Sequence, residues 1–456
     1  MPSTNPYIFR EYDIRGLVDT DLTNQTVEYI GRAFAVYCID KGVRKISIGG
    51  DVRLSTNRFI DILCNAVADA GINVVNIGVV PTPVSYFSLF HLDVGGMIMV
   101  TASHNPAEFN GFKLGVGKTT IYGKEIQEIY KIIESGHFIT GKKGSIERHD
   151  LIPDYCSFLR SKFSFKKRLK IVIDAGNGTG ALFAARLFRE FGHEVHELYC
   201  TVDGRFPNHH PDPTVEKNVQ DLIARVQEVN ADFGVGLDGD SDRIGVIDDE
   251  GKMIYGDYLL LIYALDLLRE RPGAKVIFEV KCSQALTEEI ERFGGVPIMW
   301  KTGHSLLKDK MHETGALIAG EMSGHMFFSD RYFGYDDAIY AALRLMEIID
   351  KRNEKLSAIR KALPVYFSTP EIRVECANDA EKFVIAKKAV EYFSTHYTTI
   401  TTDGVRILFG DGWGLIRSSN TQPILVLRFE AKSQQRLAEI KALVTEKLKD
   451  FGTVRI

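Results

Sequence analysis

Three aspartates alternate with small residues in the string Asp238-Gly-Asp-Ser-Asp-Arg243. In an extended or tightly turned loop, alternate carboxylates can converge on one cation, and they repel one another strongly unless a positive charge lies between them. Oxygen-only ligands favour Mg²⁺ or Ca²⁺. An EF-hand calcium loop needs glycine and glutamate where this chain has Arg243 and Asp249. Asp238, Asp240 and Asp242 are therefore predicted to bind Mg²⁺. The alternative is a solvated acidic turn, which the apolar residues 244–247 disfavour.

Ser103 is a candidate nucleophile in the string Thr101-Ala-Ser-His-Asn-Pro106. A serine can accept a phosphoryl group if a base removes its proton and cations neutralise the phosphate. Lys113 is a candidate for that neutralisation. Taken alone, the string fits a Ser-Asn-Pro turn that caps a helix better. A Ser/His/Asp hydrolase usually carries its nucleophile in G-x-S-x-G, and both glycines are missing here.

Two further polar strings could bind an anionic sugar. Arg417-Ser-Ser-Asn-Thr-Gln-Pro423 offers a guanidinium, hydroxyls and backbone N–H groups, which together can hold a phosphate. Glu321 and Ser323 offer an acceptor and a hydroxyl suited to neighbouring sugar hydroxyls. A polar hairpin turn and a glycine-containing loop, respectively, are the structural alternatives, and the sequence alone barely separates them from binding sites.

A glycine-rich string suggests a competing function. Asp174-Ala-Gly-Asn-Gly-Thr-Gly-Ala181 fits G-x-G-x-x-A between a strand and a helix, with Glu194 or Glu197 about 20 residues on. That pattern is typical of a nicotinamide- or flavin-dependent oxidoreductase. We give it little weight because the unit is one of three similar repeats and no second cofactor-binding half follows. A non-catalytic sugar-phosphate binding protein is the third hypothesis, which would need neither Ser103 nor the aspartates.

The elements that must position these strings repeat three times. Each repeat opens with an apolar strand, then has an amphipathic stretch ending near glycine and a second strand, which is the rhythm of a parallel α/β sheet. The opening strands are 45–49, 170–174 and 275–279. A third apolar run in each repeat leads into the strings at 101, 238 and 320. Ligands bind at the carboxyl ends of such strands, so the repeats are expected to point these loops at one shared cleft.

From about residue 368 the order of strand-like and helix-like stretches differs from that of the three repeats. Strand-like runs at 371–375, 405–409 and 424–431 alternate with a helix-like stretch at 379–394 and a final amphipathic helix. This pattern predicts a smaller α+β domain with an antiparallel sheet. The fold class is thus three similar mixed α/β domains plus this C-terminal domain, arranged around a central cleft. The expected domains are 1–150, 151–254, 255–367 and 368–456.

Composition excludes several classes. Hydrophobic residues are 45% and charged residues 25% of 456, an ordinary globular balance, and a net charge of −4 argues against a nucleic-acid or membrane role. No run approaches the ~20 apolar residues that span a bilayer, and a secretory signal is not expected. Six cysteines are scattered without a C-x-x-C pair, which fits a reducing cytoplasm.

The strings at 101–106, 238–243, 320–325 and 417–423 occur in the order seen in the α-D-phosphohexomutases, and the start Phe9-Arg-Glu-Tyr-Asp-Ile-Arg-Gly16 also resembles that family. The resemblance runs from about residue 7 to residue 430. It implies an isomerase that moves a phosphoryl group between the 1- and 6-positions of a hexose phosphate through phosphoserine 103, Mg²⁺ and a bisphosphorylated intermediate. It also implies hexose 1,6-bisphosphate as activator and a role in carbohydrate metabolism. We expect the fourth domain to close over the cleft and exclude water, because a phosphoenzyme open to solvent would hydrolyse. We expect a monomer or weak oligomer.

The resemblance also assigns roles to residues. Asp238, Asp240 and Asp242, with Ser103, match the metal site. The groups expected around the phosphoserine are Arg15, His104, Lys113 and Arg243. The expected sugar or substrate contacts are Tyr12, Lys281, His304, Glu321, Ser323 and His325. The phosphate that is not transferred is expected on Arg417, Ser419, Asn420 and Thr421.

The string Gly-Glu-Met-Ser-Gly-His resembles the phosphomannomutase/phosphoglucomutase branch. The phosphoglucosamine mutase branch, which remains the alternative, typically has glutamine at the position of Met322 and a Ser-Gly-Thr phosphate loop. Relatives often have glycine or alanine in place of Ser241. Mannose and glucose share the 3- and 4-hydroxyls that Glu321 and Ser323 are expected to contact, so the sequence does not choose between them.

Overall fold

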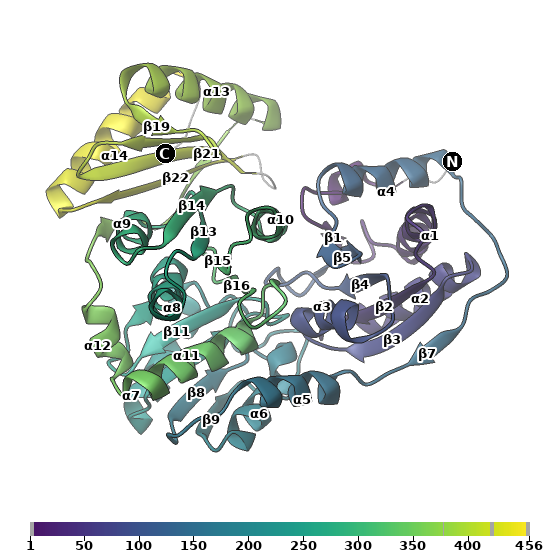
Figure 1. Ribbon diagram of the computed structural model, residues 1–456. Helices are drawn as coiled ribbons and strands as arrows, with labels where there is room; N and C mark the ends of the chain where they lie inside the picture. The colour runs from purple at the N-terminus through teal and green to yellow at the C-terminus, as the bar shows by residue number, and fades with distance from the viewer. Residues whose placement is uncertain (1–3, 377, 420–423, 453–456) are drawn as a thin grey trace. The chain divides into compact units, whose positions relative to one another are not determined.

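The computed structural model describes residues 4–376, 378–419 and 424–452 (Figure 1). The chain forms two compact units. Unit 1 is Met1–Leu259 with Ser323–Arg360, and unit 2 is Leu260–Met322 with Lys361–Ile456. Among the described residues, no helix combines the length and the apolar character needed to cross a membrane.

The first sheet of unit 1 has seven strands in the order β1-β5-β4-β2-β3-β7, with β6 paired to β5. Its strands are β1 (Ile14–Leu17), β2 (Lys45–Gly50), β3 (Asn73–Val79), β4 (Gly96–Val100), β5 (Phe109–Val116), β6 (Thr119–Thr120) and β7 (Ile146–Arg148). β2 is parallel to β3 and β4, whereas β5 is antiparallel to β4. Strands buried on both faces need continuous apolar runs, and every residue of β4 is buried.

Helices flank this sheet: α1 (Asn24–Asp40), α2 (Thr56–Asp69), α3 (Thr82–His91) and α4 (Lys124–Ser135), with a 3₁₀ turn at Pro6–Ile8. The Thr23 side chain caps α1 by accepting from the Thr26 N–H. The helices α1, α2 and α4 contribute buried residues to one apolar core with the strands. This core holds β2 and β4 in place, and the Ser103 loop follows β4.

The second sheet of unit 1 has the order β12-β11-β10-β8-β9. Its strands are β8 (Lys170–Asp174), β9 (Glu194–Leu198), β10 (Phe233–Leu237), β11 (Ile244–Asp248) and β12 (Met253–Ile254). Its helices are α5 (Ile152–Lys162), α6 (Ala184–Glu190) and α7 (Gln220–Val229), with 3₁₀ turns at Thr179–Leu182 and Glu216–Val219. β10 and β11 form an antiparallel hairpin that pairs Leu237 with Ile244. Residues 238–243, which carry the three aspartates, are therefore its loop.

Three parallel strands form the sheet of unit 2 that precedes residue 322: β13 (Lys275–Glu279), β14 (Val296–Trp300) and β15 (Ile318–Gly320), with β13 between the others. Its helices are α9 (Gln284–Arg292) and α10 (His304–Thr314), while α8 (Gly256–Glu270) crosses from unit 1 into unit 2. After β15 the chain returns to unit 1 with β16 (Met326–Phe328) and α11 (Ala338–Arg352), and α12 (Leu356–Lys361) leads back to unit 2.

The last sheet is antiparallel, in the order β17-β22-β21-β20-β19 with β18 paired to β22. Its strands are β17 (Phe367–Ser368), β18 (Ile372–Glu375), β19 (Thr398–Ile400), β20 (Val405–Leu408), β21 (Gly412–Ser418) and β22 (Ile424–Ala431). Helices α13 (Asp379–His396) and α14 (Gln434–Lys449) pack on it in one shared core (Figure 1).

The predicted fold class is confirmed: the chain has three α/β regions and a C-terminal antiparallel α+β region. The predicted opening strands correspond to β2, β8 and β13, and the polar strings at 101, 238 and 320 follow β4, β10 and β15. Arg417 differs from its predicted place in a loop, because it lies at the end of β21. The domain boundaries and the central cleft remain predictions.

Candidate active site and metal centre

The hairpin loop between β10 and β11 buries three carboxylates. Asp238, Asp240 and Asp242 have no solvent-exposed surface, and one ligand oxygen from each lies within 4.8 Å of the others. Asp238 Oδ1 accepts from the backbone N–H groups of Asp242 (3.0 Å) and Arg243 (3.1 Å). Ser241 takes a left-handed φ of 61°, which turns the loop tightly enough for the alternate side chains to converge.

Asp240 and Asp242 share the ammonium group of Lys113, which reaches them from β5. Lys113 Nζ lies 3.1 Å from Asp240 Oδ2 and also pairs with Asp242 Oδ2. Asp240 Oδ2 accepts from the hydroxyls of Thr82 (2.6 Å) and Thr101 (3.2 Å) as well. The other oxygen of each carboxylate, Oδ1, is buried and accepts no hydrogen bond from the described part of the chain.

The pKa values of two aspartates in this loop shift in opposite directions. Burial raises the pKa of Asp238 well above its usual value, and the neighbouring Asp240 and Asp242 raise it further. Burial would also raise the pKa of Asp240, but Lys113 and the hydrogen bond from Thr82 lower it below its usual value. Burial opposes the charge on Lys113, yet the two carboxylates raise its pKa well above normal.

One ammonium group does not neutralise three buried carboxylates, and two of their oxygens accept no hydrogen bond from any described residue. Buried charges are normally paired or bound to a metal. The donor set consists only of oxygens and therefore fits a hard divalent cation.

Ser103 lies directly against this loop. Its hydroxyl donates to Asp238 Oδ2 over 2.8 Å, and its side chain is almost completely buried. The residue takes a left-handed φ of 49°, and its N–H donates to Thr101 Oγ1 at 2.8 Å. The structure thus brings the candidate nucleophile and the candidate metal ligands together within unit 1.

His104 has the properties of a neutral base beside that hydroxyl. Its Nδ1 lies 3.2 Å from Ser103 Oγ. Burial lowers the pKa of His104 well below its usual value, and the positive charges of Arg243 and Arg15 lower it further. An imidazole that stays neutral at physiological pH can accept a proton.

The two predicted arginines of unit 1 are both anchored by neighbours. Arg15, on β1, donates to Asn105 Oδ1 over 2.7 Å and pairs with Asp13. Arg243 Nε donates to His325 Nε2 over 2.9 Å. The sequence predicted His325 as a substrate contact, and the structure adds its hydrogen bond to Arg243.

His325 also faces carboxylates with its second ring nitrogen. Nδ1 lies 2.9 Å from Asp336 Oδ2 and 3.6 Å from Asp242 Oδ1. Because Nε2 accepts from Arg243, the proton of a neutral imidazole must be on Nδ1, towards those carboxylates. His325 therefore lies between Arg243 of the aspartate loop and Asp336.

A second charged cluster lies in unit 2. Lys281 Nζ is 3.4 Å from Glu279 Oε1 and 3.2 Å from Glu371 Oε2. Burial raises the pKa of Glu279, while Lys281 opposes that shift. The pKa of Lys281 is raised because Glu279 and Glu371 outweigh its burial.

Two carboxylates near Lys281, Glu279 and Glu321, also accept hydrogen bonds from neutral donors. Glu279 accepts from Thr302 Oγ1 (2.5 Å) and from the Met322 N–H (3.2 Å). Glu321 accepts from the Gly303 N–H over 2.7 Å. Glu279 thereby connects the loops after β14 and β15, where His304 and Glu321 lie.

Arg417 is buried at the end of β21, and its Nε donates to Asp403 Oδ2 over 2.9 Å. The Thr302 N–H donates to the same oxygen at 3.1 Å, which brings Arg417 near the loop after β14. Ser419 is buried, and its N–H donates to Ile424 O at 3.0 Å. The predicted phosphate ligands Asn420 and Thr421 lie outside the described residues.

Three other predicted contacts occupy positions in or beside loops. Tyr12 lies half-buried just before β1, and His304 is the buried first residue of α10. Ser323 lies half-buried in the turn after β15 and belongs to unit 1. The structure leaves their roles as predictions.

Sequence reasoning missed several residues that hold the Ser103 and aspartate loops. They are Asp51, Arg53 and Thr82, whose side chains bond to these loops or to one another. The available signal was positional: Asp51-Val-Arg53 follows the buried strand β2, at the same sheet edge as the Ser103 loop.

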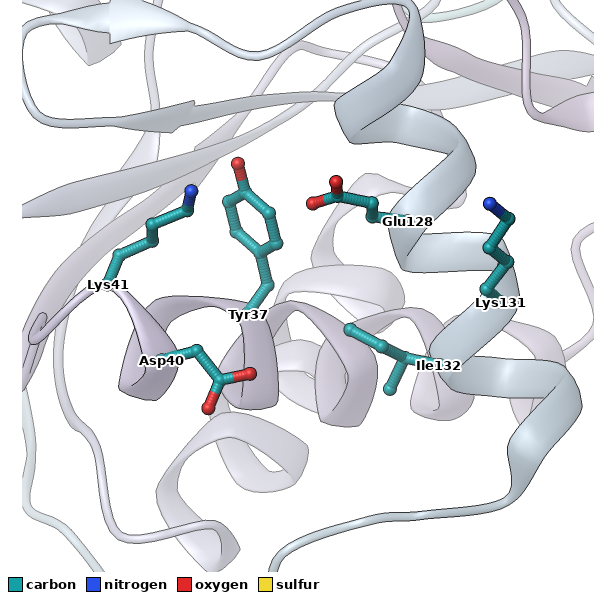
Figure 2. Close-up of a pocket in the computed structure, with 6 residues that line it drawn as sticks. All are labelled: Tyr37, Asp40, Lys41, Glu128, Lys131 and Ile132. Carbon is teal, nitrogen blue, oxygen red and sulfur yellow. The ribbon is translucent and has the colours of Figure 1, made fainter.

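A surface pocket elsewhere in unit 1 contains none of the predicted site residues. Figure 2 shows this pocket between α1 and α4, with a volume of about 380 Å³. Its lining residues are Tyr37, Asp40, Lys41, Glu128, Lys131 and Ile132. No string with candidate chemistry reaches it, so we assign it no part in the reaction.

Comparison with known proteins gives the same class of fold along the chain. Four family descriptions match in order: phosphoglucomutase/phosphomannomutase alpha/beta/alpha domain I at 6–140, domain II at 153–251, domain III at 255–366, and the C-terminal domain at 371–447. A solved structure of a phosphoglucomutase/phosphomannomutase family protein from Burkholderia thailandensis has a TM-score of 0.94 and 40% identity, with 100% of both chains covered.

Named relatives agree. A phosphomannomutase/phosphoglucomutase from Pseudomonas aeruginosa is 43% identical over 450 residues, which is 98% of this chain and 96% of the relative. A phosphoglucomutase from Neisseria meningitidis is 44% identical over 437 residues, or 95% of each chain. The chain belongs to the phosphoglucomutase/phosphomannomutase family. This confirms the predicted family and its isomerase class, and it favours a phosphohexomutase over an oxidoreductase or a non-catalytic binding protein.

Proposed function

We propose that the chain transfers a phosphoryl group reversibly between the 1- and 6-positions of a hexose phosphate, with Ser103 as the phosphorylated residue. The observation that carries the proposal is the 2.8 Å hydrogen bond from Ser103 Oγ to Asp238, inside a buried triplet of carboxylates. A serine hydroxyl alone is common, but one held against a candidate metal site and a neutral histidine has the surroundings that phosphoryl transfer needs.

The chemistry divides into two transfers. In the first, a free hydroxyl of the sugar attacks phosphoserine 103, the bond from phosphorus to Ser103 Oγ breaks, the hydroxyl proton passes to Ser103 Oγ, and the sugar becomes a bisphosphate. In the second, Ser103 Oγ attacks the other phosphate, the bond from phosphorus to the sugar oxygen breaks, and the serine proton passes through a base to that oxygen, which becomes a hydroxyl again. His104 is our candidate for that base, because its Nδ1 is 3.2 Å from Oγ and its lowered pKa keeps it neutral. No phosphoryl group is lost or gained overall.

Arg15, Lys113 and Arg243 supply positive charge near the transferred group in this proposal. Lys113 also pairs with both Asp240 and Asp242, which offsets their repulsion and keeps them close together as ligands. Asp238, Asp240 and Asp242 would hold Mg²⁺ together with Ser103. The ion would neutralise charge on the phosphoryl oxygens.

Recognition of the rest of the substrate falls to the remaining predicted residues. Glu321, with Ser323, would bind sugar hydroxyls. The further sugar contacts are Tyr12, Lys281, His304 and His325. Arg417 and Ser419, with Asn420 and Thr421, would bind the phosphate that is not transferred, since a buried arginine suits a dianion. After the first transfer the intermediate turns over in the central cleft, so that this one phosphate site serves both ends of the sugar.

The substrate class is a mannose or glucose phosphate, as in the relatives named phosphomannomutase/phosphoglucomutase. Hexose 1,6-bisphosphate is the proposed activator, because it can phosphorylate Ser103. We place the enzyme in the cytoplasm as a monomer or weak oligomer, without a nucleic-acid or membrane partner. All six cysteines are free thiols, as a reducing compartment would allow.

The decisive experiment measures conversion of mannose 1-phosphate and glucose 1-phosphate to their 6-phosphates, with Mg²⁺ and a trace of hexose 1,6-bisphosphate. Ser103→Ala should abolish turnover and remove the phosphoserine detected by mass spectrometry. Ser161→Ala, an exposed serine at the end of α5, is the matched control and should leave both unchanged. Full turnover by Ser103→Ala would refute the proposal. Conversion of glucosamine 1-phosphate alone would favour the phosphoglucosamine branch.

A further inference from the structure

Arg53 uses every N–H group of its guanidinium on nearby acceptors. Nη1 donates to the carbonyls of Pro106 (2.6 Å) and Phe109 (2.9 Å), Nη2 donates to those of Ser103 (2.9 Å) and Asn105 (2.6 Å), and Nε donates to Asp51 Oδ2 (3.1 Å). A guanidinium has five N–H donors, and all five are satisfied. Four of them go to backbone carbonyls, three in the loop that carries Ser103 and one at Phe109, where β5 begins.

Asp51 fixes the orientation of that guanidinium. Its carboxylate accepts from the Arg53 N–H (2.9 Å) and from the hydroxyls of Thr56 and Thr101 (2.9 Å each). The side chains of Asp51 and Arg53 have no exposed surface. Such a pair is costly to bury unless its geometry and remaining hydrogen bonds are good, and here each donor of Arg53 has an acceptor.

The loop needs such support because its conformation is unfavourable by itself. Ser103 is a non-glycine residue with φ at 49°, a left-handed conformation that side chains other than glycine rarely adopt. The segment between β4 and β5 forms neither helix nor strand, and within it the backbone bonds are short turns such as Asn105 N–H to Ala102 O and Phe109 N–H to Pro106 O. On its other side the Ser103 carbonyl contacts Gly239, where a Cβ would lie 2.6 Å from that oxygen. The carbonyl is thus fixed between Gly239 and Arg53.

We propose that Arg53, oriented by Asp51, is a positioning residue that holds the Ser103 backbone so that Oγ stays on the aspartate loop for phosphoryl transfer. The inference rests on the proposed function of Ser103. Arg53 does not contact substrate, because its side chain is completely enclosed by protein. Its effect passes through the loop carbonyls, and the same Asp51 carboxylate reaches Asp240 through the Thr101 hydroxyl.

The substitution Arg53→Lys tests whether the hydrogen-bond geometry of the guanidinium matters beyond its positive charge. Lysine keeps the positive charge but has three donors on one atom, so it cannot reach four carbonyls and Asp51 in a planar fork. Misplacing a reacting atom by about 1 Å can lower a rate by about 100-fold. We therefore expect kcat to fall by about 10- to 100-fold while KM stays within about twofold of wild type, since the substrate contacts are untouched.

Two readouts and a matched control make the test specific. Arg58→Lys, in α2 a few residues after Arg53 and with an exposed side chain paired to Asp19, should leave kcat, KM and loop protection unchanged. Amide hydrogen exchange should show that Arg53→Lys loses protection in residues 103–109 and keeps it in α2. A rise in KM at unchanged kcat would overturn the inference, as would unchanged exchange in the loop.

The two proposals fail in different ways. If the wild-type enzyme shows no mutase activity, the proposed function is wrong, whereas the exchange comparison still decides whether Arg53 holds the loop. If wild type is active and Arg53→Lys matches it, the positioning role is wrong and the function stands. Should Arg53→Lys not fold, Asp51→Asn, which retains Arg53 but loses its charged partner, should still lower kcat at unchanged KM; an unchanged kcat would refute the role.

Discussion

The two clusters of buried charge in this chain satisfy their carboxylates differently. In unit 1, Asp240 and Asp242 each leave one oxygen without a hydrogen-bond donor among the described residues, although both are buried. In unit 2, Glu279 and Glu321 accept from backbone N–H groups, and Glu279 also accepts from a threonine hydroxyl. Both clusters contain a lysine between carboxylates, so the presence of a cationic side chain does not distinguish them.

This difference separates a site that requires a ligand from one that is complete without it. A buried oxygen without a donor carries a desolvation cost that a metal ion can offset. Glu279 and Glu321 already accept from donors in the loops, so they hold these loops in place and need no metal for stability. Burial and negative charge alone would have marked both clusters as metal sites.

Asp240→Asn should produce the largest effect and tests the cluster that requires a ligand. Asparagine keeps the size but removes a charge that faces Lys113, so we expect kcat/KM to fall by at least about 100-fold. Glu279→Gln in unit 2 should cost about tenfold or less, because it removes support for two loops rather than a ligand. Steady-state kinetics of both variants check this. If kcat/KM fell less in Asp240→Asn than in Glu279→Gln, the conclusion that the unit 1 cluster is the one that requires a ligand would be wrong.

Metal removal should affect the same cluster. Mg²⁺ at about 100 times its Kd would stabilise the folded chain by about 2.7 kcal/mol. We expect wild type and Glu321→Gln to show the same rise in Tm when Mg²⁺ replaces EDTA, and Asp238→Asn to show none. Thermal unfolding measures this without any substrate. Loss of the Mg²⁺ response in Glu321→Gln would mean that the unit 2 cluster also binds the ion.

Arg417→Ala should change substrate affinity rather than the metal site. Charge-assisted hydrogen bonds are worth about 1.5–3 kcal/mol, so KM for the hexose phosphate should rise by about 10- to 100-fold. The Mg²⁺-dependent rise in Tm should be retained. Arg436→Ala, a half-buried arginine of α14 that pairs with Asp411, is the control in the same unit and should leave KM unchanged. An unchanged KM in Arg417→Ala would remove the proposed phosphate site.

The sequence predicted the elements because their signals are local. Apolar runs of five or six residues gave β2, β8 and β13, and glycines marked the ends of the intervening helices. The aspartate triplet was predictable for the same reason, since its members alternate within one loop. Ser103 needed the resemblance, because its own string fits a simple turn.

The supporting contacts could not be read from the sequence because they join distant residues. Thr82 and Asp240 are 158 positions apart, and Arg53 lies about 50 positions before the loop that it holds. The local sequence pattern does not indicate which buried arginine will donate to four backbone carbonyls. Likewise, His325 was predicted as a substrate contact, and only the fold showed that Arg243 donates to it.

The last test has the smallest expected effect and concerns Asp174, a carboxylate of unit 1 that lies outside the aspartate loop. Asp174 accepts from the Gly176 N–H (2.9 Å) and from His209 Nε2 (3.0 Å), so it resembles the satisfied carboxylates of unit 2. Burial would lower the pKa of His209, but its hydrogen bond to Asp174 and the charge of that carboxylate raise the pKa above 6.5. Tyr199 packs on the ring, and Asp221 adds a weaker attraction.

The raised pKa gives a definite sign to the pH dependence. The folded state binds the His209 proton more tightly than the unfolded state, so this contribution to stability is complete below about pH 6.5 and is lost as the pH rises through the folded pKa. Unfolding free energies measured in urea between pH 6 and 9 should show a decline that His209→Gln reduces. The decline should be smaller than the Mg²⁺ effect and the same in EDTA as in Mg²⁺. If it vanished in Mg²⁺, Asp174 would have to be coupled to the metal loop, and the distinction between satisfied and donor-deficient carboxylates would fail within unit 1 itself.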